Sequence, residues 1–233
     1  MISQHSSASM QTELHANGYF ILRKFLNSAQ LEALRSACTA IQEQYGVRQV
    51  LQQYPAIQAA LPVSAMHAVL SVLGLSAAST VRSLFFNKNA AHNWLVPWHQ
   101  DKTICVNTSS ARLRDYQKWT QKNGIFHVEP PADILNSMLT WRFALDDSDR
   151  DNGALKVIPG SHRAGKLTLE EISQRSAADQ SHYCELQAGD VLLIRPLLLH
   201  ASDKSRLCQQ RRILHLEMSA ALLPFPLQWA ERT

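Results

Sequence analysis

Apolar residues recur at two different spacings along the chain of 233 residues, and the spacing changes near residue 80. Before this point they recur every three or four positions, as on one face of a helix. A helix is predicted from Asn27 or Ser28, either of which can cap it, to Ile41. Two shorter helices are predicted within residues 55–80, which Pro62 divides. An apolar stripe on the second short helix is typical of a core face rather than of a cofactor site.

Two segments near the start depart from this helical spacing. Residues 1–10 are rich in serine, and we expect them to be loose. Residues 15–23 contain an Asn-Gly turn signal followed by the apolar run Tyr19-Phe20-Ile21-Leu22, which predicts a first strand.

After residue 80 the apolar runs become short and are bounded by turn residues, which is typical of strands. The strands are predicted at 82–88, 94–101, 135–145, 154–159, 183–186, 191–194 and 211–218. The chain is therefore predicted to be mainly β with flanking helices. We expect one domain over 1–233, with a mainly helical part at 1–80 packed outside a β core at 81–220.

Residues 107–131 interrupt the predicted strands with a long polar stretch. A long loop with little structure of its own inside a compact domain is often a lid or a binding loop. A plain surface excursion is the alternative. The stretch contains Arg112, Arg114, Tyr116, Lys118, Trp119 and Lys122, and its Arg and Lys residues favour contact with an anionic small molecule.

Composition narrows the class of protein. Hydrophobic residues make up 45% of the chain, which is enough for one buried core. The formal net charge of +4 comes from scattered basic residues, as on an ordinary surface or on a protein that binds an anionic ligand. A basic face with stacking aromatic residues is not visible, so we do not expect a nucleic-acid partner.

The cysteines and the chain start bear on the compartment. Cys38, Cys105, Cys184 and Cys208 are widely spaced and form no Cys-x-x-Cys motif, so we expect reduced thiols in the cytoplasm. The polar first residues do not resemble a signal peptide. The apolar runs are too short to cross a bilayer, so no membrane partner is expected. The sequence does not indicate an oligomeric state.

The segment Trp98-His99-Gln100-Asp101 carries the candidate chemistry. On a strand, positions i and i+2 point to the same face, so His99 and Asp101 would converge on one point. One imidazole and one carboxylate are two-thirds of the 2-His-1-carboxylate set that holds iron(II) and leaves coordination positions open. Zinc accepts the same donors. The third ligand must come from a distant part of the chain.

Four features in order resemble the phytanoyl-CoA dioxygenase family. They are His99-Gln100-Asp101, the segment from Asn152-Gly153 to Pro159-Gly160-Ser161-His162, then His200, and Arg211 eleven residues later. The resemblance covers about 82–218 and is weaker in the helical part. It implies a double-stranded β-helix (a jelly-roll, cupin-like fold) and the cofactors Fe(II), 2-oxoglutarate and O2. It also implies His200 as the third metal ligand.

The resemblance further implies a co-substrate pocket. Arg211 is expected to bind the distal carboxylate of 2-oxoglutarate, because guanidinium matches carboxylate with two parallel hydrogen bonds. Arg212 would then face the other way along the strand. Ser202 matches a position that hydrogen-bonds the co-substrate, Leu84 and Arg142 match pocket-lining positions, and Asn93 is a weaker candidate. Arg142 is a departure, since Trp is common there in the family.

The expected activity is hydroxylation of an unactivated C–H bond of a small molecule, with release of succinate and CO2. Relatives that halogenate have a small residue in place of the carboxylate, whereas this chain keeps Asp101. No catalytic residue beyond the metal ligands is expected, and His162 is interpreted as structural. The alternatives are a metal-binding β-helix protein that is not an oxygenase (a hydrolase, isomerase or binding module) and an inactive interaction protein. The substrate itself is not indicated.

Overall fold

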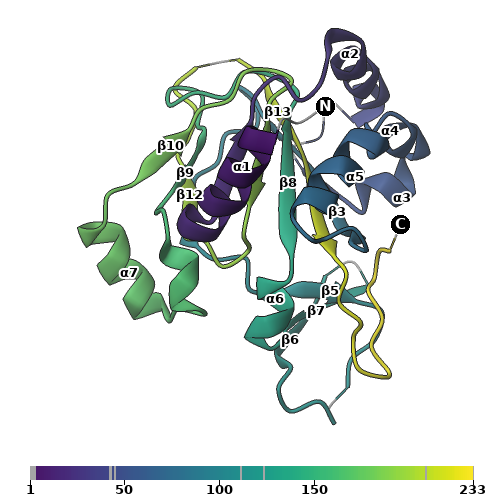
Figure 1. Cartoon of the computed structure of the whole chain (residues 1–233), viewed down its shortest axis with the longest axis vertical. Helices are drawn as coiled ribbons and strands as arrows, with labels where there is room; N and C mark the ends of the chain where they lie inside the picture. The colour runs from purple at the N-terminus through teal and green to yellow at the C-terminus, as the bar shows by residue number, and fades with distance from the viewer. Residues whose placement is uncertain are drawn as a thin grey trace.

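The computed structural model describes residues 4–41, 44, 46–110, 112–122, 124–207 and 209–232. Two antiparallel sheets form its centre (Figure 1). The larger has the strand order β1-β11-β8-β13-β3-β2, and the smaller has the order β10-β9-β12-β4. A third sheet, β5-β7-β6, lies at one end.

The elements alternate helix and strand in the first third and are mostly strands afterwards. The helices are α1 (Gln4–Asn17), α2 (Ser28–Ala37), α3 (Val50–Gln53), α4 (Pro55–Ala59), α5 (Val63–Val72), α6 (Ala132–Asn136) and α7 (Leu169–Ala178), with short 3-10 turns at Thr39–Ile41 and Ser161–Ala164. The strands are β1 (Tyr19–Leu22), β2 (Gly46–Arg48), β3 (Ser79–Lys88), β4 (Val96–His99), β5 (Ile104–Val106), β6 (Gln117–Lys122), β7 (Ile125–Glu129), β8 (Leu139–Ala144), β9 (Leu155–Val157), β10 (His182–Cys184), β11 (Val191–Ile194), β12 (His200–Ser202) and β13 (Arg211–Ser219).

The two main sheets enclose an apolar layer. Val157 of the small sheet packs with Leu192 and Ile213 of the large sheet, and each is at most 1% exposed. Two antiparallel sheets that face each other in this way form the jelly-roll arrangement, or double-stranded β-helix, as the sequence predicted.

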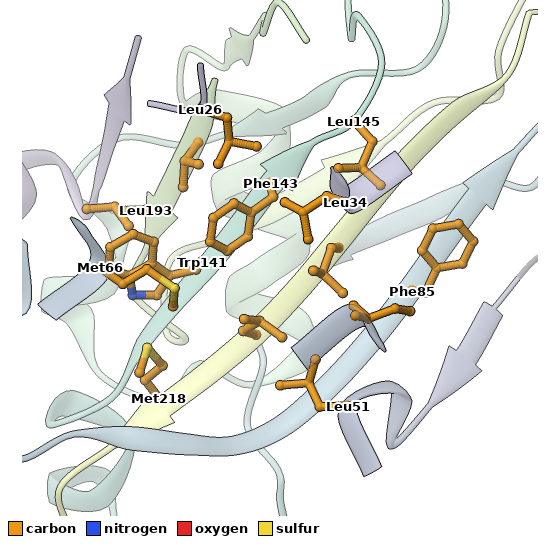
Figure 2. Close-up of a cluster of buried hydrophobic side chains, with 14 of the residues drawn as sticks. Leu26, Leu34, Leu51, Met66, Phe85, Trp141, Phe143, Leu145, Leu193 and Met218 are labelled. Atoms are coloured by element: carbon orange, nitrogen blue, oxygen red, sulfur yellow. The ribbon is translucent and has the colours of Figure 1, made fainter. Parts of the chain in front are cut away.

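The opposite face of the large sheet is covered by helices. Trp141 and Phe143 of β8 stack at a ring distance of 5.9 Å and pack with residues of α2 and α5 (Figure 2). Leu34 and Met66 come from those two helices, and Leu214 of β13 belongs to the same cluster. Burial of this amphipathic helical layer is the main source of its stability, since short helices are marginal alone.

Local signals for helix ends are confirmed. Asn27 accepts a hydrogen bond from Gln30 N at 2.9 Å and forms a capping box at the start of α2. Pro62 separates α4 from α5 as expected. Val63, the first residue of α5, is however 64% exposed, so the buried apolar face of this helix begins only at Met66.

Two expectations about the bounds of elements were wrong. Residues 4–10 belong to α1 rather than to a loose segment, because Met10 and Leu14 are buried against the core and override the weak helix preference of serine. Residues 1–3 lie outside the described residues. The strand expected at 135–145 starts only at Leu139, because α6 occupies Leu135.

The polar stretch 107–131 was expected to have little structure of its own. Instead, β6 and β7 form a hairpin that pairs with β5. Most of β6 is exposed, so it lacks the apolar alternation by which a strand is recognised. Whether this hairpin acts as a lid stays a prediction. No helix among the described residues is long and apolar enough to cross a membrane.

Candidate metal and co-substrate site

Strand pairing brings the two distant histidines together. His200 at the start of β12 is the direct cross-strand partner of His99 at the end of β4. Their ring centroids lie 4.2 Å apart. Side chains of directly opposed residues project to the same face, so both imidazoles enter the space between the sheets.

Asp101 joins them from the loop after β4. The expectation that it lies on the strand was wrong, since β4 ends at His99. Its backbone N–H bonds Pro196 O at 2.9 Å, which turns the chain here. The Asp101 carboxylate lies 3.7 Å from His99 Nε2 and 3.6 Å from His200 Nε2. The three donor atoms lie within 4.8 Å of one another, so the set could hold one metal ion.

Hydrogen bonds fix which imidazole nitrogen is free. His99 Nδ1 lies 2.8 Å from Pro97 O, and His200 Nδ1 lies 2.8 Å from Leu198 O. A carbonyl only accepts, so each Nδ1 carries the proton and each Nε2 keeps its lone pair. This backbone support is what metal-ligating histidines normally have.

The protonation states of His200 and Asp101 also favour the binding of a metal cation. Burial lowers the pKa of His200 to about 4, so its imidazole is neutral at pH 7. Burial alone would raise the pKa of Asp101, but the adjoining His200 and His99 outweigh it and lower the pKa to about 2. An ionised Asp101 carboxylate beside the neutral His200 imidazole suits the binding of iron(II) or zinc.

Gln100, between His99 and Asp101 in the sequence, fixes their segment through hydrogen bonds on the side away from the cavity. Its side chain is buried and bonds Leu197 O at 2.7 Å and Gly165 O at 2.8 Å. It also accepts a bond from Leu167 N at 2.8 Å. Gln100 therefore points away from the cavity that its two neighbours line.

A cavity of about 130 Å³ contains the three donors and extends to a basic end. At about 30 Å³ per water molecule, this is room for roughly four waters, the size of a small keto acid. Arg211 lines it and is 3% exposed. Its Nη1 donates to Gly153 O at 2.7 Å, whereas Nε has no acceptor among the described residues. Burial lowers the pKa of Arg211 to about 9.

Arg142 belongs to a hydrogen-bonded chain along the same wall. It donates to His215 Nδ1 at 2.9 Å, so the His215 proton is on Nε2, 3.4 Å from Glu217. Arg82 pairs with the same Glu217 oxygen at 3.0 Å. The Glu217 carboxylate is therefore neutralised within the wall, and it does not compensate Arg211.

The remaining predicted residues have different positions. Ser202 lines the cavity, but its Oγ already donates to Gly153 O at 2.8 Å. Leu84 lines this cavity and also a larger one beside it. Asn93 lines only the larger cavity, and its amide bonds Ser205 O and N at 2.7 and 2.8 Å. Arg212 faces away from the cavity and binds Asp146 at 2.8 and 2.7 Å, as its strand position predicted.

Sequence reasoning missed Lys88, which is 1% exposed and lines the cavity. A signal was present, because Lys88 is four residues after Leu84 on the same strand and must share its face. It also missed the support from Gln100, whose burial has no local sequence signature.

The larger cavity, of about 620 Å³, adjoins the metal cavity along Arg82, Leu84, Phe86 and Trp94. It is of the size that holds drug-sized molecules. Arg48 and Lys122 line it, and Glu231, which bonds Ser83, is its acidic residue among the described ones.

Two observations test whether the residues fit the expected cofactors. Two free Nε2 atoms and one carboxylate match the donors that iron(II) takes in this type of site. Arg211 has an unused, buried donor that fits the distal carboxylate of 2-oxoglutarate. Both groups therefore fit.

Comparisons with known proteins agree. A family model described as phytanoyl-CoA dioxygenase (PhyH) matches residues 14–213. The dioxygenase FUM3 of Gibberella moniliformis is 32% identical over 87 residues, which are 37% of this chain and 27% of that protein. The match thus spans about a quarter of the length of this curated relative.

Solved structures show the same fold. AviO1 from Streptomyces viridochromogenes matches with a TM-score of 0.70 at 16% identity, over 96% of this chain and 98% of that one. The epimerase SnoN, crystallised with Fe3+, alpha ketoglutarate and nogalamycin RO, matches with a TM-score of 0.71 at 12% identity, over 99% and 95%. The chain belongs to the phytanoyl-CoA dioxygenase (PhyH) family, whose cofactors are iron(II), 2-oxoglutarate and O2.

Proposed function

We propose that the protein is a dioxygenase that hydroxylates an unactivated C–H bond of a small molecule and releases succinate and CO2. One observation carries the proposal: three metal donors and a buried arginine with an unused donor line the same small cavity. When bound, iron(II) and 2-oxoglutarate supply the oxidising chemistry.

Each residue then has a role in binding or positioning. His99, Asp101 and His200 hold the metal, and Arg211 binds the distal carboxylate of 2-oxoglutarate. Arg142 and Leu84 line the pocket of the co-substrate. No side chain is needed as a general base, and the buried part of the cavity wall, including Leu84 and Leu155, helps to keep water from the reacting carbon.

Asp101 favours hydroxylation over halogenation, because its carboxylate occupies the metal position that a halide would need. Other oxidative outcomes are distinguished by product mass. Hydroxylation adds one oxygen atom, epimerisation leaves the mass unchanged, and ring closure removes two hydrogen atoms.

The substrate is proposed to bind in the larger cavity and to be anionic. Arg48 and Lys122 line this cavity and form no ion pair with a described residue. Phe86 and Trp94, at the boundary with the metal cavity, would hold the apolar part near the metal. The free thiols Cys38, Cys105 and Cys184 fit a reducing cytoplasm.

The test is succinate production by protein loaded with iron(II) under anaerobic conditions and then exposed to O2. Candidate substrates are small acids, amino acids and thioesters, each with a neutral counterpart. We expect at least one acid to stimulate succinate production and to gain an oxygen atom. Stimulation by the neutral counterparts alone would contradict the anionic assignment.

His99→Ala should abolish iron binding and succinate production, because two donors do not retain the metal at working concentrations. His67→Ala is the matched control, since His67 is exposed on α5, away from the cavity. Full iron-dependent turnover by His99→Ala would overturn the site. Bound metal without any 2-oxoglutarate turnover in the unmodified protein would favour the hydrolase or binding-module alternative.

A further inference from the structure

Lys88 lies at the basic end of the metal cavity, although no part of the proposed function uses it. It is the last residue of β3 and the direct cross-strand partner of Arg211 on β13. Both side chains therefore project to the same face, into the cavity that they line. The Lys88 ammonium also lies 5.4 Å from the centre of the Trp94 ring.

The ammonium is held in position by two acceptors. Lys88 Nζ donates to Ser202 Oγ and to Asp203 O, both at 2.6 Å. Ser202 Oγ in turn donates to Gly153 O, which also accepts the bond from Arg211. An ammonium has three donors, so one remains for a ligand. This is the same situation as at Arg211 Nε, whose buried N–H has no acceptor among the described residues.

Gly153 is required for this arrangement. Its φ is +79°, and a Cβ there would lie 2.6 Å from Asp203 O and 3.2 Å from Lys88 Nζ. Any larger residue would push the Asp203 backbone off the lysine. The Asn152-Gly153 turn therefore has a second role besides reversing the chain. Because Gly153 has no side chain, Lys88 can bind Asp203 O next to the Gly153 carbonyl that accepts the bond from Arg211.

No carboxylate of a described residue binds the Lys88 ammonium. The Asp203 side chain, the nearest candidate, is held by Lys156 at 2.8 and 2.9 Å and by Tyr183 at 2.8 Å. Burial, followed by the charges of Arg211 and Arg142, lowers the pKa of Lys88 to about 7, and Asp203 offsets this only in part. Buried cations without a counter-charge are costly, so an anionic ligand is expected at this end.

We propose that Lys88 is a second cationic partner of the distal carboxylate of 2-oxoglutarate, beside Arg211. The inference rests on the proposed function, because that function places the co-substrate in this cavity. The carboxylate has two oxygens, and the two unused donors, on Lys88 and Arg211, come from opposed positions on neighbouring strands. Ser202, whose hydroxyl is already engaged on both sides, positions Lys88 rather than binding the carboxylate itself.

A dependence on pH follows. A carboxylate beside Lys88 favours its charged form, so binding above pH 7 takes up a proton. The affinity for 2-oxoglutarate must then fall as pH rises from 7 to 8.5, by at most about tenfold per pH unit. Of the other charged groups that face Lys88, Asp203 has a lowered pKa and stays ionised in this window. Burial lowers the pKa of Arg142 and lowers that of Arg211 to about 9, which lies above the window, so Lys88 is the main group that titrates within it.

The experiment is calorimetric titration of 2-oxoglutarate into full-length protein loaded with nickel, which prevents turnover. Lys88→Met should weaken binding about ten- to a hundredfold and remove its dependence on pH between 7 and 8.5. Nickel affinity should not change, because Lys88 touches no metal ligand. Lys204→Met is the matched control, since Lys204 is an exposed lysine in the loop after β12, and it should bind like the unmodified protein.

Two further readouts separate binding from a structural role. Unmodified protein should prefer 2-oxoglutarate strongly over its 5-amide, and Lys88→Met should lose much of this preference. Titrations of the unmodified protein at pH 8, in two buffers with different ionisation enthalpies, should show uptake of nearly one proton. This second measurement does not depend on whether the variant folds.

Unchanged affinity, pH dependence and acid preference in Lys88→Met would overturn the role of Lys88, as would the absence of proton uptake in the unmodified protein. If nickel-loaded unmodified protein does not bind 2-oxoglutarate at all, the proposed function fails first. The two failures are therefore distinguishable.

Discussion

The two faces of β13 have opposite characters, although every residue from Ile213 to Ser219 is buried. The outward face presents Leu214 and Leu216 to the helical layer, where they belong to the same apolar cluster as Leu34 and Met66. The inward face presents Arg211, His215 and Glu217 to the metal cavity. One face contributes stability by burying apolar surface, whereas the other keeps charge away from water.

This difference shows where the molecule tolerates unfavourable burial. Arg211 donates to Gly153 O, has an Nε–H without an acceptor among the described residues, and has a lowered pKa. Lys88 beside it has no carboxylate partner among the described residues. Such groups persist because the helical layer on the other face stabilises the same strands. The comparison can be tested by changing one face at a time.

The largest effect is expected from Leu214→Ala, which removes a fully buried side chain of the outward face. The free energy of unfolding should fall by about 2–5 kcal/mol because a cavity is left in a packed core. Urea denaturation measures this loss. The Kd for 2-oxoglutarate of the folded variant should not change. A loss of affinity equal to the loss of stability would mean that the two faces are coupled.

Arg211→Met should have the reverse effect on the inward face. The Kd and the KM for 2-oxoglutarate should rise about a hundredfold, or about 2.7 kcal/mol, because the distal carboxylate loses its guanidinium partner. The ligand-free protein should be as stable as before or more stable, because an incompletely paired buried charge is replaced by an apolar chain. An unchanged KM would mean that Arg142 or Lys88, rather than Arg211, binds the distal carboxylate.

Arg212→Met is the matched control one residue along the strand and has the smallest expected effect. Arg212 binds Asp146 with two bonds at the edge of the helical layer, so its loss should lower the free energy of unfolding by about 1 kcal/mol. Binding of 2-oxoglutarate should be unaffected, because the side chain faces away from the cavity. Weakened binding would show that the site depends on the register of β13 rather than on Arg211 itself.

The sequence determined features that depend on neighbours along the chain. Helix α2 was predictable from its cap at Asn27 and its apolar spacing, and β11 from its apolar run between turn residues. The two-residue separation of His99 and Asp101 indicated that they act together, although Asp101 reaches the site from the loop after β4 rather than from the strand. The opposite orientations of Arg211 and Arg212 were predictable because successive residues of a strand face opposite ways.

The tertiary structure decided what depends on strand register and long-range packing. It placed His200 opposite His99 and Lys88 opposite Arg211, and pairing between distant strands cannot be inferred from local spacing. It also made a helix of residues 4–10 and a hairpin of 117–129, because burial of Met10 and pairing with β5 outweigh the local preferences of polar residues. Local interactions favour particular elements, and contacts between remote segments decide which of these elements form.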